Sequence, residues 1–163
     1  MKLATLQDLY VRELKDLYSA EKQLIGALPR MARAAHNPEL AAGFREHLEQ
    51  TKGHAQRLEQ ILFRHKQSAH AAKCQGMEAI IAEGAEMIEQ QADAEVKDAG
   101  LISAAQRVEH YEIAGYGTAR TYAELLGDEQ DARLLQMTLE EEEETDLKLT
   151  ALARCSINLA AAR

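Results

Sequence analysis

Several acidic side chains stand among apolar residues of this sequence, at positions where a helix would turn them toward its buried side. At about 100° per residue, Glu21 falls near the middle of one apolar stripe. Glu109 and Glu112 are three residues apart and therefore share a second helix face. In the run LEEEEETDLKL, Glu142 and Asp146 lie closest to the apolar stripe, while the other glutamates point toward solvent. Five carboxylates are thus predicted to face one core.

Imidazole and amide side chains take the place of acids in a further segment, EHLEQTKGH. The same angular placement brings His47 and His54 to one edge of its apolar stripe, with Gln50 between them. Gln50 and His54 are spaced by four residues, as are Glu142 and Asp146, and side chains four apart share a helix face.

Five inward carboxylates require a counter-charge, because burying even one unpaired ion costs several kcal/mol. Protonation can neutralise one or two of them, but the apolar stripes hold few cations, of which Arg120 is the clearest. Helical bundles that bind paired iron or manganese use one Glu from each of two helices and a Glu with a His from each of the others. Hard oxygen donors suit these metals. The residues therefore predict a site for one or two iron or manganese ions.

The two halves of the chain present related patterns of these residues. Glu21 recurs as Glu112, 91 positions later, and the Gln50 and His54 pair recurs 92 positions later as Glu142 and Asp146. The repeat is imperfect, because Gln50 stands where its symmetry mate is Glu and Asp146 where its mate is His. A neutral amide binds iron more weakly than a carboxylate, so Gln50 weakens the prediction for one of the two metal positions.

The elements that position these residues are all helical, and no window shows the alternation of a strand. Pro38 marks the start of a helix, Gly127 is predicted to end one, and Asp128 is predicted to cap the next. A polar stretch, KQSAHAAKCQG, is predicted to be a loop. The sequence predicts four long helices and one short one, over residues 4–36, 39–66, 77–91, 97–126 and 129–160. We expect an all-α four-helix bundle forming a single domain over residues 1–163, with residues 67–96 crossing between its halves.

Composition limits the function classes. The net charge of −8 argues against nucleic acid and anionic membranes as partners, because both require a basic patch. Apolar residues make up 46% of the chain but never form the run of about 20 that a membrane span needs. Cys74 and Cys155 show no metal-binding or redox spacing, which is typical of reduced thiols. We expect a cytoplasmic protein.

The motifs YSAEKQL, EHLEQTKGH, AAQRVEHYEIAGYGT and LEEEEETDLKLT resemble the YciF/YciE-type family of ferritin-like bacterial proteins over nearly the whole chain. The resemblance implies a ferritin-like antiparallel four-helix bundle with extra short helices, a homodimer, and an association with stress responses. It implies metal-site positions at Glu21, Glu109, Glu112, Glu142 and Asp146. Gln50 departs from the family pattern, in which Glu is frequent.

Two function classes follow from these observations. In the first, two metals bridged by Glu21 or Glu112 react with dioxygen or peroxide, as in a di-metal oxidase, ferroxidase or peroxidase-like enzyme. In the second, the bundle is a non-catalytic structural or interaction protein with a degenerate site. Gln50 is the residue that favours the second class, and the sequence alone leaves the choice open.

Overall fold

A computed structural model describes residues 3–70 and 72–163, and among these residues no β-strand is present. Six α-helices and one π-helical turn account for most of them. In chain order the elements are α1 (Leu6–Ala34), α2 (Pro38–Arg64), α3 (Gln75–Glu89), α4 (Ala94–Leu126), α5 (Glu129–Leu152), the π-helix η1 (Ala153–Ile157) and α6 (Asn158–Ala161).

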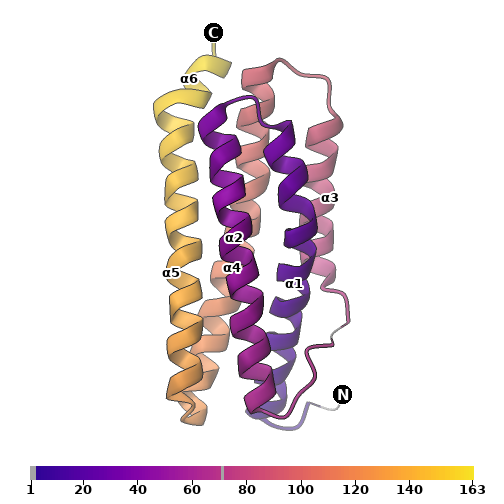
Figure 1. Cartoon of the computed structure of the whole chain (residues 1–163), viewed down its shortest axis with the longest axis vertical. Coiled ribbons are helices and arrows are strands. Elements are labelled where there is room, and N and C mark those ends of the chain that lie inside the picture. The colour runs from indigo at the N-terminus through magenta and orange to yellow at the C-terminus, as the bar shows by residue number, and fades with distance from the viewer. Residues whose placement is uncertain (1–2, 71) are drawn as a thin grey trace.

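The four long helices α1, α2, α4 and α5 form a bundle in which the chain runs up, down, down and up (Figure 1). Because α2 and α4 run in the same direction, the chain must return along the bundle between them, and α3 provides this return. Helix α3 packs against α1 and α4, so it covers one side of the bundle. This arrangement confirms the expected ferritin-like bundle and its crossover segment.

Local signals in the sequence fix where the helices begin and end. Thr5 and Asp8 form a reciprocal capping box at the start of α1. The Asn37 side chain accepts hydrogen bonds from two backbone N–H groups at the start of α2, and Pro38 occupies its first turn. Gly127 ends α4 in the left-handed region at φ 80°, as predicted. Asp128 precedes α5 as predicted, but its side chain makes no capping hydrogen bond.

The hydrophobic core consists of two clusters stacked along the bundle axis. One contains Leu24 and Phe44 and lies toward the turn between α1 and α2. The other contains Leu17 and Leu58 and lies toward the opposite end. On α1, Glu21 therefore lies between Leu17 of one cluster and Leu24 of the other. The buried acids occupy a polar layer between two apolar ones.

The end of the chain differs from the predicted helix over residues 129–160. Helix α5 gives way at Ala153 to the five-residue π-helical turn η1, and α6 then continues to Ala161. No helix in the described part of the chain combines the length and apolar character that a membrane span requires.

Candidate metal centre

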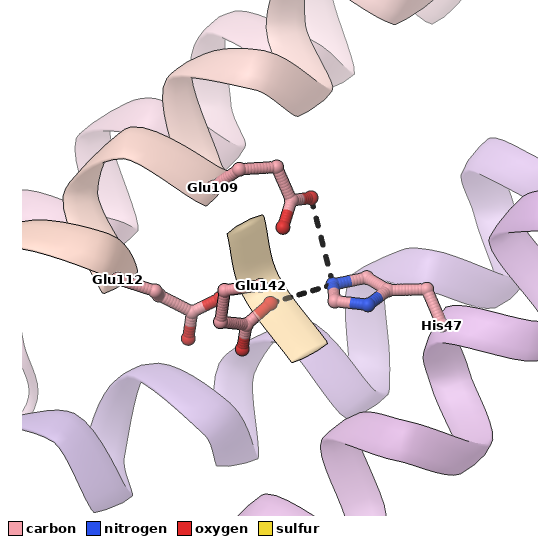
Figure 2. A group of neighbouring side chains, drawn as sticks. All are labelled: His47, Glu109, Glu112 and Glu142. Atoms are coloured by element: carbon pink, nitrogen blue, oxygen red, sulfur yellow. Dashed lines mark ion pairs between the residues drawn. The ribbon is translucent and has the colours of Figure 1, made fainter. Parts of the chain in front are cut away.

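Two groups of buried side chains meet in the polar layer of the bundle. Each residue of a group offers one ligand atom, and within each group these atoms all lie within 4.8 Å of one another. The first group is His47, Glu109, Glu112 and Glu142; Figure 2 shows these four side chains converging from α2, α4 and α5. The second group is Glu21, His54 and Glu142. Because Glu142 belongs to both, two adjacent ion positions would share it.

Helical spacing explains how each element supplies its ligands. His47 and His54 are seven residues apart, so they project from almost the same line along α2, two turns from each other. Glu109 and Glu112, three residues apart on α4, point inward from adjacent turns. Helix α5 contributes Glu142 alone to these groups.

The distances across the site are close to the spacing of ligands around a common centre. His47 Nε2 lies 3.5 Å from Glu109 Oε1 and 3.8 Å from Glu142 Oε2, as the dashed lines of Figure 2 mark. His54 Nδ1 lies 2.9 Å from Glu142 Oε1 and 3.5 Å from Glu21 Oε1. The His54–Glu142 approach is short, yet neither atom is oriented for a hydrogen bond. Such atoms point toward a shared space more than toward each other.

Most ligand atoms of this site lack a hydrogen-bond partner. Among the described residues, nine of the ten buried side-chain N and O atoms without a partner belong to the six residues of the two groups. Both carboxylate oxygens of Glu112 and of Glu142 are among them, as are both ring nitrogens of His47. Unpartnered buried polar atoms are rare in folded proteins and call for an explanation such as an ion.

Arginine and lysine do not balance these acids. In the described part of the chain, neither forms an ion pair with Glu21, Glu109, Glu112 or Glu142, whose ion pairs are with histidine only. Arg120, the clearest cation in the apolar stripes of the sequence, instead donates to Gln136 Oε1 at 2.6 Å.

Burial perturbs the protonation of every ligand. Burial raises the pKa of Glu109 and Glu112 well above 4.5, and the neighbouring negative charges raise both further. Burial alone would lower the pKa of His54, but the close carboxylates of Glu142 and Glu21 raise it to about 10. Burial lowers the pKa of His47 and leaves it neutral. Without metal the site therefore retains protons, which a bound cation would displace.

A second layer of side chains orients His54. Its Nε2 lies 2.7 Å from Glu141 Oε2, which leaves Nδ1 facing the site. Glu141 is in turn held by two hydrogen bonds from Arg57, of 2.7 and 2.9 Å, which keep its pKa below the usual value. Carboxylates that hold the far nitrogen of a histidine ligand fix its orientation and raise its basicity.

Glu141 corrects the prediction from sequence, which placed the glutamates of this run other than Glu142 in solvent. Its partner Arg57 comes from α2, and a pattern within α5 carries no signal of that contact. Tyr116 on α4 also contacts a ligand. It is fully buried, and its hydroxyl donates to Glu21 Oε1.

The two remaining residues that were predicted from sequence as ligands are Gln50 and Asp146, and Asp146 lies outside both groups. Gln50 is half-buried and lines a groove beside His47. Asp146 accepts a hydrogen bond of 3.0 Å from Gln106 Nε2 and lies 3.6 Å from His110 Nε2 at the edge of the bundle. In the predicted repeat, Glu21 and Glu112 both supply a ligand atom, whereas His54 supplies one and its counterpart Asp146 does not.

A separate cluster at the far end of the bundle is already neutralised. Asp131 is buried, pairs with Arg64, lies 2.6 Å from His65 Nε2 and accepts a 3.2 Å hydrogen bond from the Tyr10 hydroxyl. Because its charge and lone pairs have protein partners, this cluster is explained as a structural network.

A groove whose wall carries several polar side chains leads from the surface to the central site. This groove of about 330 Å³ between α2 and α5 is lined by His47, Gln50 and Glu109 at its inner end and by Glu46 and Lys148 at its rim. Lys148 Nζ lies 3.1 Å from Glu46 Oε1, so an ion pair stands over the entrance.

Comparison with known proteins places this chain in a family. Residues 5–162 match the family model described as a domain of unknown function, DUF892. The chain belongs to this family. Protein YciF of Escherichia coli K12 is 48% identical over 159 residues, which cover 97% of this chain and 96% of that protein.

Solved structures of relatives share the fold of the family. The structure of the E. coli stress protein YciF matches with a TM-score of 0.92 over 96% of this chain and 99% of that one. A Rhodopseudomonas palustris protein described as structural is 38% identical, with a TM-score of 0.88 over 91% and 95% of the two chains. A Dps protein from Bacillus brevis, at 19% identity and a TM-score of 0.67 over 93% and 99%, shares the ferritin-like fold.

Proposed function

We propose that this protein binds two iron or manganese ions between its four long helices and uses them in oxidative chemistry associated with stress. His47, Glu109, Glu112 and Glu142 would hold one ion, and Glu21, His54 and Glu142 the other. Bound ions of these metals would supply a redox change toward dioxygen or peroxide. The chain itself supplies oriented donors, a buried site and a groove with polar side chains for the ions.

The observation that carries this proposal is the set of nine unpartnered ligand atoms on six buried residues. Four carboxylates and two imidazoles with so few hydrogen bonds would be costly to retain as a structural feature, because each unsatisfied group costs roughly 1–3 kcal/mol. A pair of divalent cations balances four carboxylates and occupies the free lone pairs. The E. coli relative's description as a stress protein agrees with such a role.

The alternative is a non-catalytic bundle, and the R. palustris relative's description as a structural protein is in line with it. The sequence argument for that alternative was Gln50 as a lost ligand. Gln50 lines the groove beside His47, and without it the six residues of the two groups still offer four carboxylates and two imidazoles. The metal-centre proposal is therefore the better supported of the two.

The test is elemental analysis of protein expressed without an affinity tag and purified without chelator, followed by titration of the metal-free protein with Fe(II) and Mn(II). We expect two ions per chain and, with Fe(II), oxidation on exposure to dioxygen or peroxide. Double replacement of His47 and His54 by leucine should remove both ions while the helical content stays that of the wild type. Retention of metal by this variant would overturn the proposed ligand set.

We further propose that the protein acts as a homodimer in the cytoplasm. Exposed apolar side chains on the outer helix surfaces, such as Leu125 and Leu147, support association. Cys74 and Cys155 are free thiols, which agrees with a reducing compartment. Light scattering at micromolar concentration should give twice the 18.1 kDa chain mass.

A further inference from the structure

A second opening reaches the metal centre from a different side and has a different chemical character. It is a cavity of about 40 Å³ between α1, α3 and α4, in the part of the bundle that α3 covers. Its wall is mostly apolar and includes Leu28, Met31, Ile81 and Ala104, with Arg30 as a charged member. Glu109, from the first ligand group, is part of the same wall.

The size of this cavity restricts what it can hold. One water needs roughly 10–15 Å³, so the part of this space that lies between the helices suits one small molecule. Water itself is a poor occupant, because an ordered water needs two to four polar partners and this wall offers few. Hydrogen peroxide is disfavoured for the same reason. A small apolar molecule fits both the volume and the wall.

The cavity and the groove between α2 and α5 meet at the same two residues. Phe44 and Glu109 line both, and they are only 3% and 2% exposed. One Glu109 oxygen, Oε2, is buried without a hydrogen-bond partner. The groove carries Glu46, Gln50 and Lys148 in its wall and so offers polar partners to ions and water. The apolar cavity suits a molecule that neither carries charge nor needs hydrogen bonds.

We propose that this cavity is a binding site for dioxygen, held beside Glu109 for delivery to the metal ions. This inference rests on the proposed function and narrows it. Dioxygen, and not peroxide, would be the oxidant that reaches the metal ions through the apolar cavity. Ions and water then use the groove between α2 and α5.

Gly84 offers a conservative way to reduce this space. A Cβ added there would lie 3.6 Å from Ala104 Cβ and 3.9 Å from Met31 Sδ, which are ordinary contacts, so Gly84→Ala fills part of the cavity without a clash. Gly26→Ala is the matched control, since Gly26 is an exposed helical glycine with no atom within 4 Å of an added Cβ. Both changes raise helix propensity equally.

The first arm of the test is a crystal structure under xenon pressure, because xenon reports small apolar cavities whether or not metal is bound. We expect a xenon atom against Leu28, Ile81 and Ala104 in the wild type and in Gly26→Ala, with severalfold lower occupancy in Gly84→Ala. Ordered waters in the cavity, or xenon bound elsewhere only, would overturn the proposal.

The second arm measures Fe(II) oxidation in the three proteins at several dioxygen concentrations. Gly84→Ala should need severalfold more dioxygen for half-maximal rate than Gly26→Ala, with similar rates at saturation and with peroxide as the oxidant. Equal dioxygen dependence would reject delivery through this cavity. If the wild type oxidises no iron, the proposed function fails, and the xenon arm shows whether the cavity fails with it.

Discussion

Glu112→Met should stabilise the metal-free protein and weaken its metal site. Glu112 is fully buried, neither of its carboxylate oxygens has a hydrogen-bond partner, and burial raises its pKa. Methionine is unbranched, of similar length and needs no polar partner. Removing an unsatisfied buried group recovers roughly 1–3 kcal/mol. At about 2–4 °C per kcal/mol for a chain of this size, the melting temperature should rise by roughly 2–12 °C.

Metal should stabilise Glu112→Met less than it stabilises the wild type. A ligand that binds only the folded state stabilises it in proportion to the logarithm of free ligand over Kd. Because Glu112→Met loses one donor of the first group, the gain in melting temperature on adding Mn(II) should shrink relative to the wild type. The assay is thermal unfolding followed by circular dichroism, with and without chelator, alongside elemental analysis of each sample.

Asp98→Ala is the matched control, because Asp98 is an equally buried acid with its oxygens satisfied. They accept hydrogen bonds from the backbone N–H groups of His36 and Asn37 at 2.8 and 2.7 Å, where α1 turns into α2. This substitution should destabilise the protein by about 2 kcal/mol or more with and without metal. If Glu112→Met destabilises the metal-free protein as Asp98→Ala does, Glu112 is a structural residue and the reasoning is refuted.

Further predictions concern the surroundings of the site. Glu141→Gln should weaken metal binding by roughly 10–100-fold, because Glu141 orients His54, whereas the exposed Glu143→Gln should bind metal as the wild type does in the same calorimetric titration. Asp146→Asn should leave the metal stoichiometry unchanged, because Asp146 belongs to neither ligand group, and a changed number of ions per chain would return it to the ligand set. The pKa of His54 is raised from 6.5 to about 10, so the stability that its charge contributes is complete below pH 6.5 and is lost as the pH rises toward 10. Chemical unfolding of the metal-free protein should therefore show falling stability over this range, and a rise would contradict the assignment of His54 as a cation without metal.

Helical periodicity was sufficient to predict the fold and most of the inward residues. Glu21, Glu109, Glu112 and Glu142 meet in the structure because each lies within the apolar stripe of its own helix. Pro38 and Gly127 also predicted the start of α2 and the end of α4 within a few residues. Proline fixes its own φ angle and glycine accepts a positive one, so both residues act on the backbone directly.

The ligand set itself was less predictable, because a wheel drawn for one helix shows which way a side chain faces but not which partner on another helix it meets. Asp146 was placed inward with Glu142, but it accepts a hydrogen bond from Gln106 on α4 instead. A step of seven residues drifts by only about 20°, which is why His47 and His54 both reach the site.

Contacts between side chains of different helices could not be predicted from the sequence. The Arg57–Glu141–His54 chain joins α2 to α5, and no pattern within either helix indicates it. The same holds for the apolar cavity, whose wall combines residues from α1, α3 and α4.

The measurement that tests the central claim most directly is anomalous diffraction from crystals of the metal-free protein soaked with Mn(II). The account predicts two peaks per chain, one among His47, Glu109, Glu112 and Glu142 and one between Glu21 and His54, with Glu142 contacting both. A polar layer that shows no anomalous peak at millimolar Mn(II), with its carboxylates hydrogen-bonded to each other or to water, would contradict it.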